Sequence, residues 1–99
     1  MNGVINRDEE IVYSRPIENA TTDSGGWLYI ASVSQIPDTA KFMGNVNTST
    51  NNYCIGRIYC NGTAWYAQVF NTSGTYVSMA KSTNIGNVSF YYILPKTII

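Results

Sequence analysis

Apolar and polar residues alternate along several short segments of this chain, most clearly in residues 53–70, YCIGRIYCNGTAWYAQVF. Two β-rich runs flank Asn61-Gly62, which favours a type I′ hairpin turn because both central residues of that turn need positive φ. Counting back from a two-residue turn places four pairs on one face: Cys60–Thr63, Ile58–Trp65, Gly56–Ala67 and Cys54–Val69. This face is apolar or small almost throughout, which predicts that it belongs to the core.

Similar short runs occur at residues 27–33 (WLYIASV), 41–46 (KFMGNV), 75–79 (TYVSM) and 88–94 (VSFYYIL). No segment has an apolar period of 3.6 residues over a helical length. About six or seven short strands with turn residues between them predict an all-β fold, an antiparallel β-sandwich or jelly-roll-like domain. The expected core comprises Trp27 or Leu28, Ile30, Phe42, Cys54, Ile58, Trp65, Val69, Val77, Phe90 and Tyr92.

The first 26 residues differ from the rest because they are polar, acid-rich and weakly patterned. They end in NATTDSGG, which is typical of turns and linkers. We therefore expect an N-terminal arm or stem connector over residues 1–26 and a β-sandwich head domain over residues 27–99. An ordinary first strand followed by a loop is the alternative for this segment.

Neutral polar residues dominate the surface composition, since charged residues make up only 12% of the chain while Asn occurs eleven times and Tyr eight times. Such a surface suits contacts with sugars or other protein chains, whereas nucleic acid requires clustered Lys and Arg. The net charge is zero, which suits a subunit of an assembly more than a free monomer.

The few charges are unevenly distributed. All six acids lie in the first 38 residues, so residues 1–38 carry −4 and residues 39–99 carry +4 once the basic residues are included. This separation indicates contact between the two parts or between copies of the chain. Chance in a chain with few charges is the alternative explanation.

The sequence contains no set of titratable residues that is typical of a catalytic site. The chain has no His, and the predicted strands after residue 38 contain no acid that could act as a base or metal ligand. Cys54 and Cys60 lack a His partner and, at ~3.3 Å per residue, lie about 20 Å apart on one strand, too far for a disulfide. The sequence therefore predicts a protein that is not an enzyme, with no cofactor and no metal site.

Membrane insertion and secretion signals are also missing from the sequence as given. It has no apolar run of about 20 residues, and MNGVINRDEE has no apolar signal-peptide region. These observations predict synthesis in the cytoplasm and no membrane insertion.

The second face of the hairpin mixes phenols, a guanidinium and an amide. Its candidate contact residues are Tyr53, Arg57, Tyr59, Tyr66 and Gln68. Rings stack on the apolar faces of sugars while amide and guanidinium groups bond hydroxyls, so this face is a candidate platform for a glycan. The alternative is that it packs on the second sheet or on a neighbouring subunit.

Three segments together carry a resemblance: GGWLYIAS, the Asn-Gly hairpin with WYAQVF, and the final VSFYYILP. Over residues 25–95 the chain resembles the C-terminal head domains of bacteriophage tail fibres and related receptor-binding proteins, which are small, all-β and usually trimeric. The resemblance implies a homotrimer that attaches the virion to a host cell-surface glycan or protein. It also implies that residues 1–26 bind other virion proteins, and that the protein is made in the host cytoplasm and displayed on the virion.

The chain departs from this family in length, because tail fibres are normally much longer. A complete chain of 99 residues better suits a structural virion protein, either a capsid decoration protein or a head-fibre subunit, anchored through residues 1–26. A fragment of a longer chain suits the receptor-binding head. A bacterial surface lectin is a third interpretation.

Overall fold

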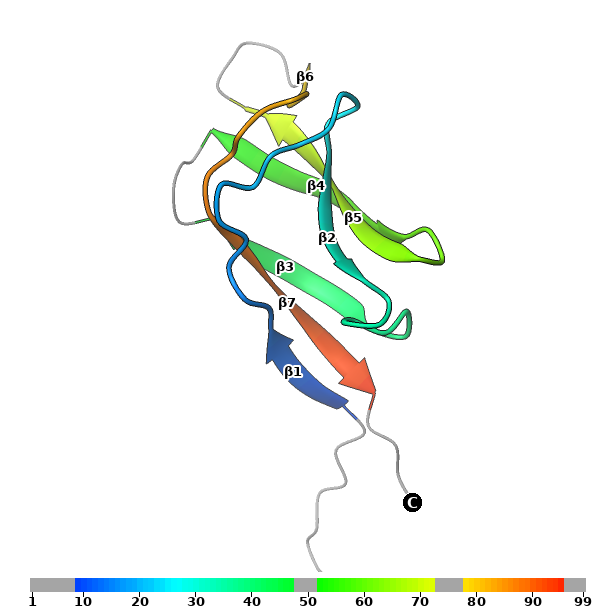
Figure 1. Ribbon diagram of the computed structural model, residues 1–99. Coiled ribbons are helices and arrows are strands. Elements are labelled where there is room, and N and C mark those ends of the chain that lie inside the picture. Colours follow the sequence, from blue (N-terminus) through cyan, green and yellow to red (C-terminus); the bar gives the residue numbers. More distant parts are fainter. Residues whose placement is uncertain (1–8, 48–51, 73–77, 96–99) are drawn as a thin grey trace, which may run out of the picture.

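The computed structural model describes residues 9–47, 52–72 and 78–95, and they form seven β-strands (Figure 1). The strands are β1 (Glu9–Tyr13), β2 (Trp27–Ser32), β3 (Lys41–Asn47), β4 (Tyr53–Cys60), β5 (Ala64–Asn71), β6 (Ser78–Met79) and β7 (Val88–Pro95). The described residues contain no helix, and hence none long and apolar enough to span a membrane. The predicted all-β fold is confirmed.

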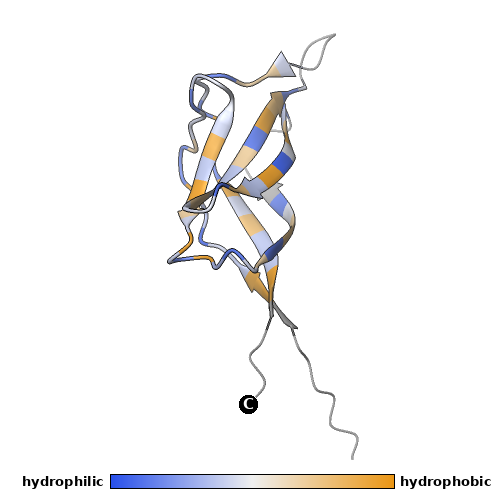
Figure 2. Ribbon diagram, turned by 90° about the vertical axis from the view of Figure 1, so that its right-hand side faces the viewer, coloured by the Kyte–Doolittle hydropathy of each residue, from blue (hydrophilic) through white to orange (hydrophobic). Residues whose placement is uncertain are grey.

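The strands form two antiparallel sheets that pack face to face. One sheet has the order β1-β7-β3, and the other has the order β2-β5-β4 with β6 paired to the end of β5. Apolar and polar positions alternate along the strands (Figure 2), as expected when one face of each sheet is buried. The molecule is therefore the predicted β-sandwich, with β7 and β5 as the central strands.

The core lies between the sheets and consists of two adjoining clusters. One gathers around Leu28, Val69 and Phe90, and the other around Trp65 and Tyr92. Phe42 joins the two clusters, because its ring centroid lies 4.8 Å from that of Trp65 and 6.0 Å from that of Phe90. Burial of Leu28, Trp65, Val69, Phe90 and Tyr92 confirms most of the predicted core, whereas Ile30, Phe42 and Ile58 are partly buried and Val77 lies outside the described residues.

The hairpin between β4 and β5 has a different register from the predicted one. Cys60 pairs with Trp65 and Ile58 with Ala67. Residues 61–63 separate the two strands, in place of the predicted two-residue turn. Asn61 explains the change, because its Oδ1 accepts hydrogen bonds from the backbone N–H groups of Thr63 and Ala64, each at 2.9 Å. The register moves by two positions, which preserves the faces. Trp65 is accordingly buried and Ile58 partly buried.

A β-bulge in the middle of β4 overturns two further predictions. The pairing shifts between Ile55 and Ile58, so the residues that precede the bulge change faces. Ile55 and Tyr53 therefore pack against the core, and Cys54 is exposed. The prediction of Cys54 in the core is wrong, and so is the placement of Tyr53 on the outer face.

The sandwich begins earlier in the chain than predicted. β1 pairs with β7 over its whole length, and two bridges continue this contact, Ile17 with Val88 and Thr21 with Asn84. Ala20 is buried in the core, and Thr22 is buried beside it. Residues 9–26 thus belong to the sandwich, although the sequence assigns them to an arm, while residues 1–8 lie outside the described residues.

Candidate functional site

The outer face of the β2-β5-β4 sheet carries a cluster of aromatic side chains. Tyr29, Tyr66 and Tyr59 occupy one row across the three strands, and Trp27 lies opposite Gln68 two positions further along. The row between them consists of Leu28, Ala67 and Ile58 and points into the core. Alternation along the strands therefore directs the tyrosines outward. We call the outward set the aromatic platform, and it consists of Trp27, Tyr29, Arg57, Tyr59, Tyr66 and Gln68.

Contacts between the rings make the platform continuous. The Trp27 and Tyr59 rings pack edge to face with centroids 5.1 Å apart, although the two residues lie on strands separated by β5. The ring centroids of Tyr29 and Tyr66 are 5.7 Å apart, and those of Tyr59 and Tyr66 are 6.3 Å apart. These separations lie within the range of favourable aromatic pairs, so the rings hold one another in place before any ligand arrives.

A turn fixes the position of Trp27 at the end of the platform. The carboxylate of Asp23 accepts hydrogen bonds from the backbone N–H groups of Gly25 at 2.8 Å and Trp27 at 3.0 Å. The carbonyl of Gly26, whose φ is 85°, accepts a hydrogen bond from the N–H of Val69 at 2.9 Å. Trp27 is thereby attached to both the turn and the central strand β5.

The polar groups of the platform are an exposed arginine and a partly buried amide. The Arg57 guanidinium carbon lies 5.1 Å from the centroid of the Tyr59 ring, a cation–π distance, and forms no ion pair with the described side chains. Gln68 Nε2 donates to the sulfur of Met79 at 3.5 Å. Tyr29 has half of its surface exposed. The arrangement can stack a ligand against rings and donate hydrogen bonds, and it presents no general base.

The described part of the chain also offers no metal centre near the platform. Within it, no group of three or more His, Cys, Asp or Glu side chains is placed so that it could hold a metal ion.

Four of the five residues predicted as a contact surface are brought together here: Arg57, Tyr59, Tyr66 and Gln68. Tyr53 is separated from them because the β4 bulge turns it toward the core. The suggestion that this face packs on the second sheet is wrong, since that sheet covers the opposite face.

Sequence reasoning missed Trp27 and Tyr29. Their alternation with Leu28 is visible in WLYIAS, but the apolar character of both sides leaves the inward side ambiguous. Pairing of β2 with β5 removes the ambiguity, because Leu28 lies beside buried Ala67 and Tyr29 beside Tyr66.

Comparison with known proteins adds no relative: no family model matches the chain, and neither does any curated protein or solved structure.

Proposed function

We propose that this chain is a non-catalytic recognition module that binds a cell-surface glycan on its aromatic platform. The observation that carries the proposal is the continuous layer of four rings, Trp27, Tyr29, Tyr59 and Tyr66, on an outer sheet face. Tyrosine and tryptophan supply large contact area at a low entropic cost, and Arg57 and Gln68 supply donors for hydroxyl groups. The low charge content leaves rings and neutral polar groups as the main contacts of the platform.

The biological setting that we propose is a viral fibre head that attaches the virion to its host. The resemblance of residues 25–95 to phage tail-fibre heads supports this setting, as does the small all-β fold. In this role the protein is made in the host cytoplasm and displayed on the virion. We favour a glycan over a protein as receptor because the platform offers stacking surfaces and only one charged group.

A pair of tyrosine variants tests the platform. Tyr29 and Tyr13 both lie on edge strands, on the outer faces of different sheets, and each contacts one further tyrosine ring. The wild-type protein should bind some members of an array of bacterial surface polysaccharides. Tyr29→Ala should weaken that binding about tenfold, because it removes a central stacking surface.

Tyr13→Ala is the matched control and, once light scattering shows that it has the same mass in solution as the wild type, should bind as the wild type does. Equal losses in the two variants would contradict a site on the β2-β5-β4 face. A wild-type protein that binds no polysaccharide on the array would overturn the proposed function.

A structural virion protein is the second candidate, and a specific observation favours it. Three large hydrophobic side chains are exposed on the β1-β7-β3 sheet: Ile11 at 60%, Tyr13 at 72% and Met43 at 53%. Apolar exposure of this kind marks contact surfaces. We propose that further copies of the chain cover this face in a homotrimer, which the zero net charge also favours.

Replacement of Ile11 by aspartate is expected to convert the trimer into monomers, because the interface would bury an unpaired charge. Sedimentation or light scattering measures the mass in solution. Ser34→Asp, which adds the same charge in an exposed loop, should leave the trimer intact. A monomeric wild-type protein would contradict the assembly.

A further inference from the structure

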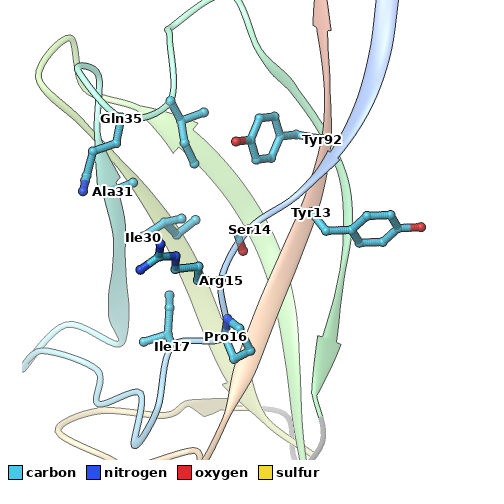
Figure 3. A pocket seen from close by; sticks show the side chains of 10 residues that line it. Tyr13, Ser14, Arg15, Pro16, Ile17, Ile30, Ala31, Gln35 and Tyr92 are labelled. Carbon is cyan, nitrogen blue, oxygen red and sulfur yellow. The ribbon is translucent and has the colours of Figure 1, made fainter.

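A cleft opens along one side of the sandwich, between β2 and the segment that follows β1 (Figure 3). Its volume is about 420 Å³, within the range of small-molecule sites. Ser14, Arg15, Ile17, Ile30, Gln35 and Tyr92 contribute to its wall. The cleft is separate from the platform, because it lies between the sheets and not on an outer face.

Tyr92 brings a phenol hydroxyl to the cleft, and its ring is buried while the hydroxyl oxygen stays accessible from the cleft. Only 6% of this residue is exposed, and its ring packs against Phe42 with centroids 5.1 Å apart. The hydroxyl points into the cleft (Figure 3), and among the described residues it has no hydrogen-bond partner. Burial raises the pKa of Tyr92 above its ordinary value, so the phenol stays neutral and can donate a hydrogen bond at physiological pH.

Arg15 supplies the charge of the cleft. Its side chain extends into the same space as that of Tyr92, whereas the Tyr13 ring at the rim points away (Figure 3). None of the described side chains forms an ion pair with Arg15, and no acid is among the residues that line the cleft. An unpaired guanidinium beside a neutral donor favours an anionic ligand, and carboxylates match its geometry.

Two more polar side chains at the wall are held in place by the backbone. The Ser14 Oγ accepts a hydrogen bond from the N–H of Phe90 at 2.8 Å, and the Gln35 Oε1 accepts one from the N–H of Ser32 at 3.1 Å. The Ser14 hydroxyl and the Gln35 amide can still donate to a ligand. Ile17 and Ile30 form an apolar wall beside them.

We propose that this cleft binds a carboxylate-bearing sugar unit, such as a uronic acid residue of a surface polysaccharide. Arg15 binds the carboxylate, Tyr92 and Gln35 bond ring hydroxyls, and the isoleucines contact the apolar ring face. The inference deepens the proposed function, because it adds an acidic sugar to the glycan that the platform holds.

Titration of the labelled protein with D-glucuronate and with D-glucose, followed by NMR, tests the cleft directly. The two sugars share a ring and differ in the carboxylate. Glucuronate should bind in the millimolar range with shifts in the signals of Arg15 and Tyr92, and glucose should bind about tenfold more weakly or less. Equal binding of the two sugars would overturn the proposal.

Variants separate the cleft from other cationic sites. Arg15→Gln and Tyr92→Phe should each weaken glucuronate binding, the first by about tenfold or more. Lys41→Gln is the control, because Lys41 is the cation at a cleft on the opposite side of the sandwich. Circular dichroism establishes that each variant is folded. Unchanged binding in a folded Arg15→Gln, or the same loss in Lys41→Gln, would contradict the assignment.

The two proposals can fail independently. Polysaccharide binding that depends on Tyr29, with no glucuronate binding, would refute the cleft and leave the platform. Glucuronate binding that depends on Arg15, with no polysaccharide bound on the array, would refute the platform and leave the cleft.

Discussion

Replacing Trp65 with alanine is expected to lower the free energy of unfolding by about 3–5 kcal/mol, the usual effect of removing a large buried ring. Trp65 is only 6% exposed and packs on Phe42 with ring centroids 4.8 Å apart. Its Nε1 donates a hydrogen bond to the carbonyl of Ile36 at 2.9 Å, so the ring also attaches the connection after β2 to the core. Small domains have a total stability of ~5–15 kcal/mol, and this loss is a large part of it.

Trp65→Phe separates the packing of the ring from its hydrogen bond. Phenylalanine keeps most of the apolar contact with Phe42 but leaves the Ile36 carbonyl without its donor, which should cost about 1–3 kcal/mol. Urea unfolding followed by circular dichroism measures both variants without relying on tryptophan fluorescence. A loss below about 1 kcal/mol in Trp65→Ala, or equal losses in the two variants, would contradict this account.

The hairpin shows how far alternation predicts a register. Apolar alternation in residues 53–70 correctly placed Ile58 and Trp65 on the inner face. The pairing itself was wrong because Asn61 bonds its own turn, an interaction that the Asn-Gly motif alone does not reveal. Burial alone does not reveal this error, because side chains alternate between the faces with a period of two residues, and a shift of two positions leaves each side chain on its predicted face.

The β4 bulge was not predictable from alternation. An inserted residue reverses the faces beyond it, which exposed Cys54 and buried much of Tyr53. The one local signal in YCIGRIYC is Gly56, which lies within the interruption, because an isolated Gly in a strand often marks a bulge; the apolar residues on both sides of the strand do not show which face each side takes. The wrongly placed residues, Tyr53 and Cys54, therefore both lie before the bulge.

The platform was predictable only where its residues are neighbours in one hairpin. Tyr59, Tyr66 and Gln68 follow from alternation in β4 and β5, while Trp27 and Tyr29 reach the same face through the pairing of β2 with β5. That pairing joins segments nearly 40 positions apart, and its register carries no local signal.

The cleft depends even more on tertiary structure. Tyr92 was predicted as a core residue, and its ring is one, but the direction of its hydroxyl follows from the packing of two sheets. Arg15 lies in a segment without clear periodicity that the sequence assigns to an arm. The described part of this segment is held by the pairing of β1 with β7 and by two isolated bridges, Ile17 with Val88 and Thr21 with Asn84.

Substitution of Gly26 by alanine is expected to destabilise the protein by about 2–4 kcal/mol, for two separate reasons. The φ of Gly26 is 85°, in the region that L side chains rarely adopt. A Cβ there would also lie 2.8 Å from Met79 Cε and 3.1 Å from Met79 Cβ, so the Met79 methyl group would have to turn away and its Cβ would have to yield by a few tenths of an ångström.

Gly62 provides a matched control because it shares one of these causes and lacks the other. Its φ is 98°, but a Cβ at this position would meet nothing within 4 Å. Gly62→Ala should therefore show the backbone strain alone, about 1–2 kcal/mol, and the remainder in Gly26→Ala should come from crowding at Met79.

Urea unfolding of both variants, and of the double variant Gly26→Ala/Met79→Ala, measures the two contributions. The double variant should recover part of the crowding loss, since the Met79 Cε contact disappears while the Cβ contact stays. Equal losses in Gly26→Ala and Gly62→Ala would show that Met79 accommodates the added Cβ, and would contradict the crowding assigned to it.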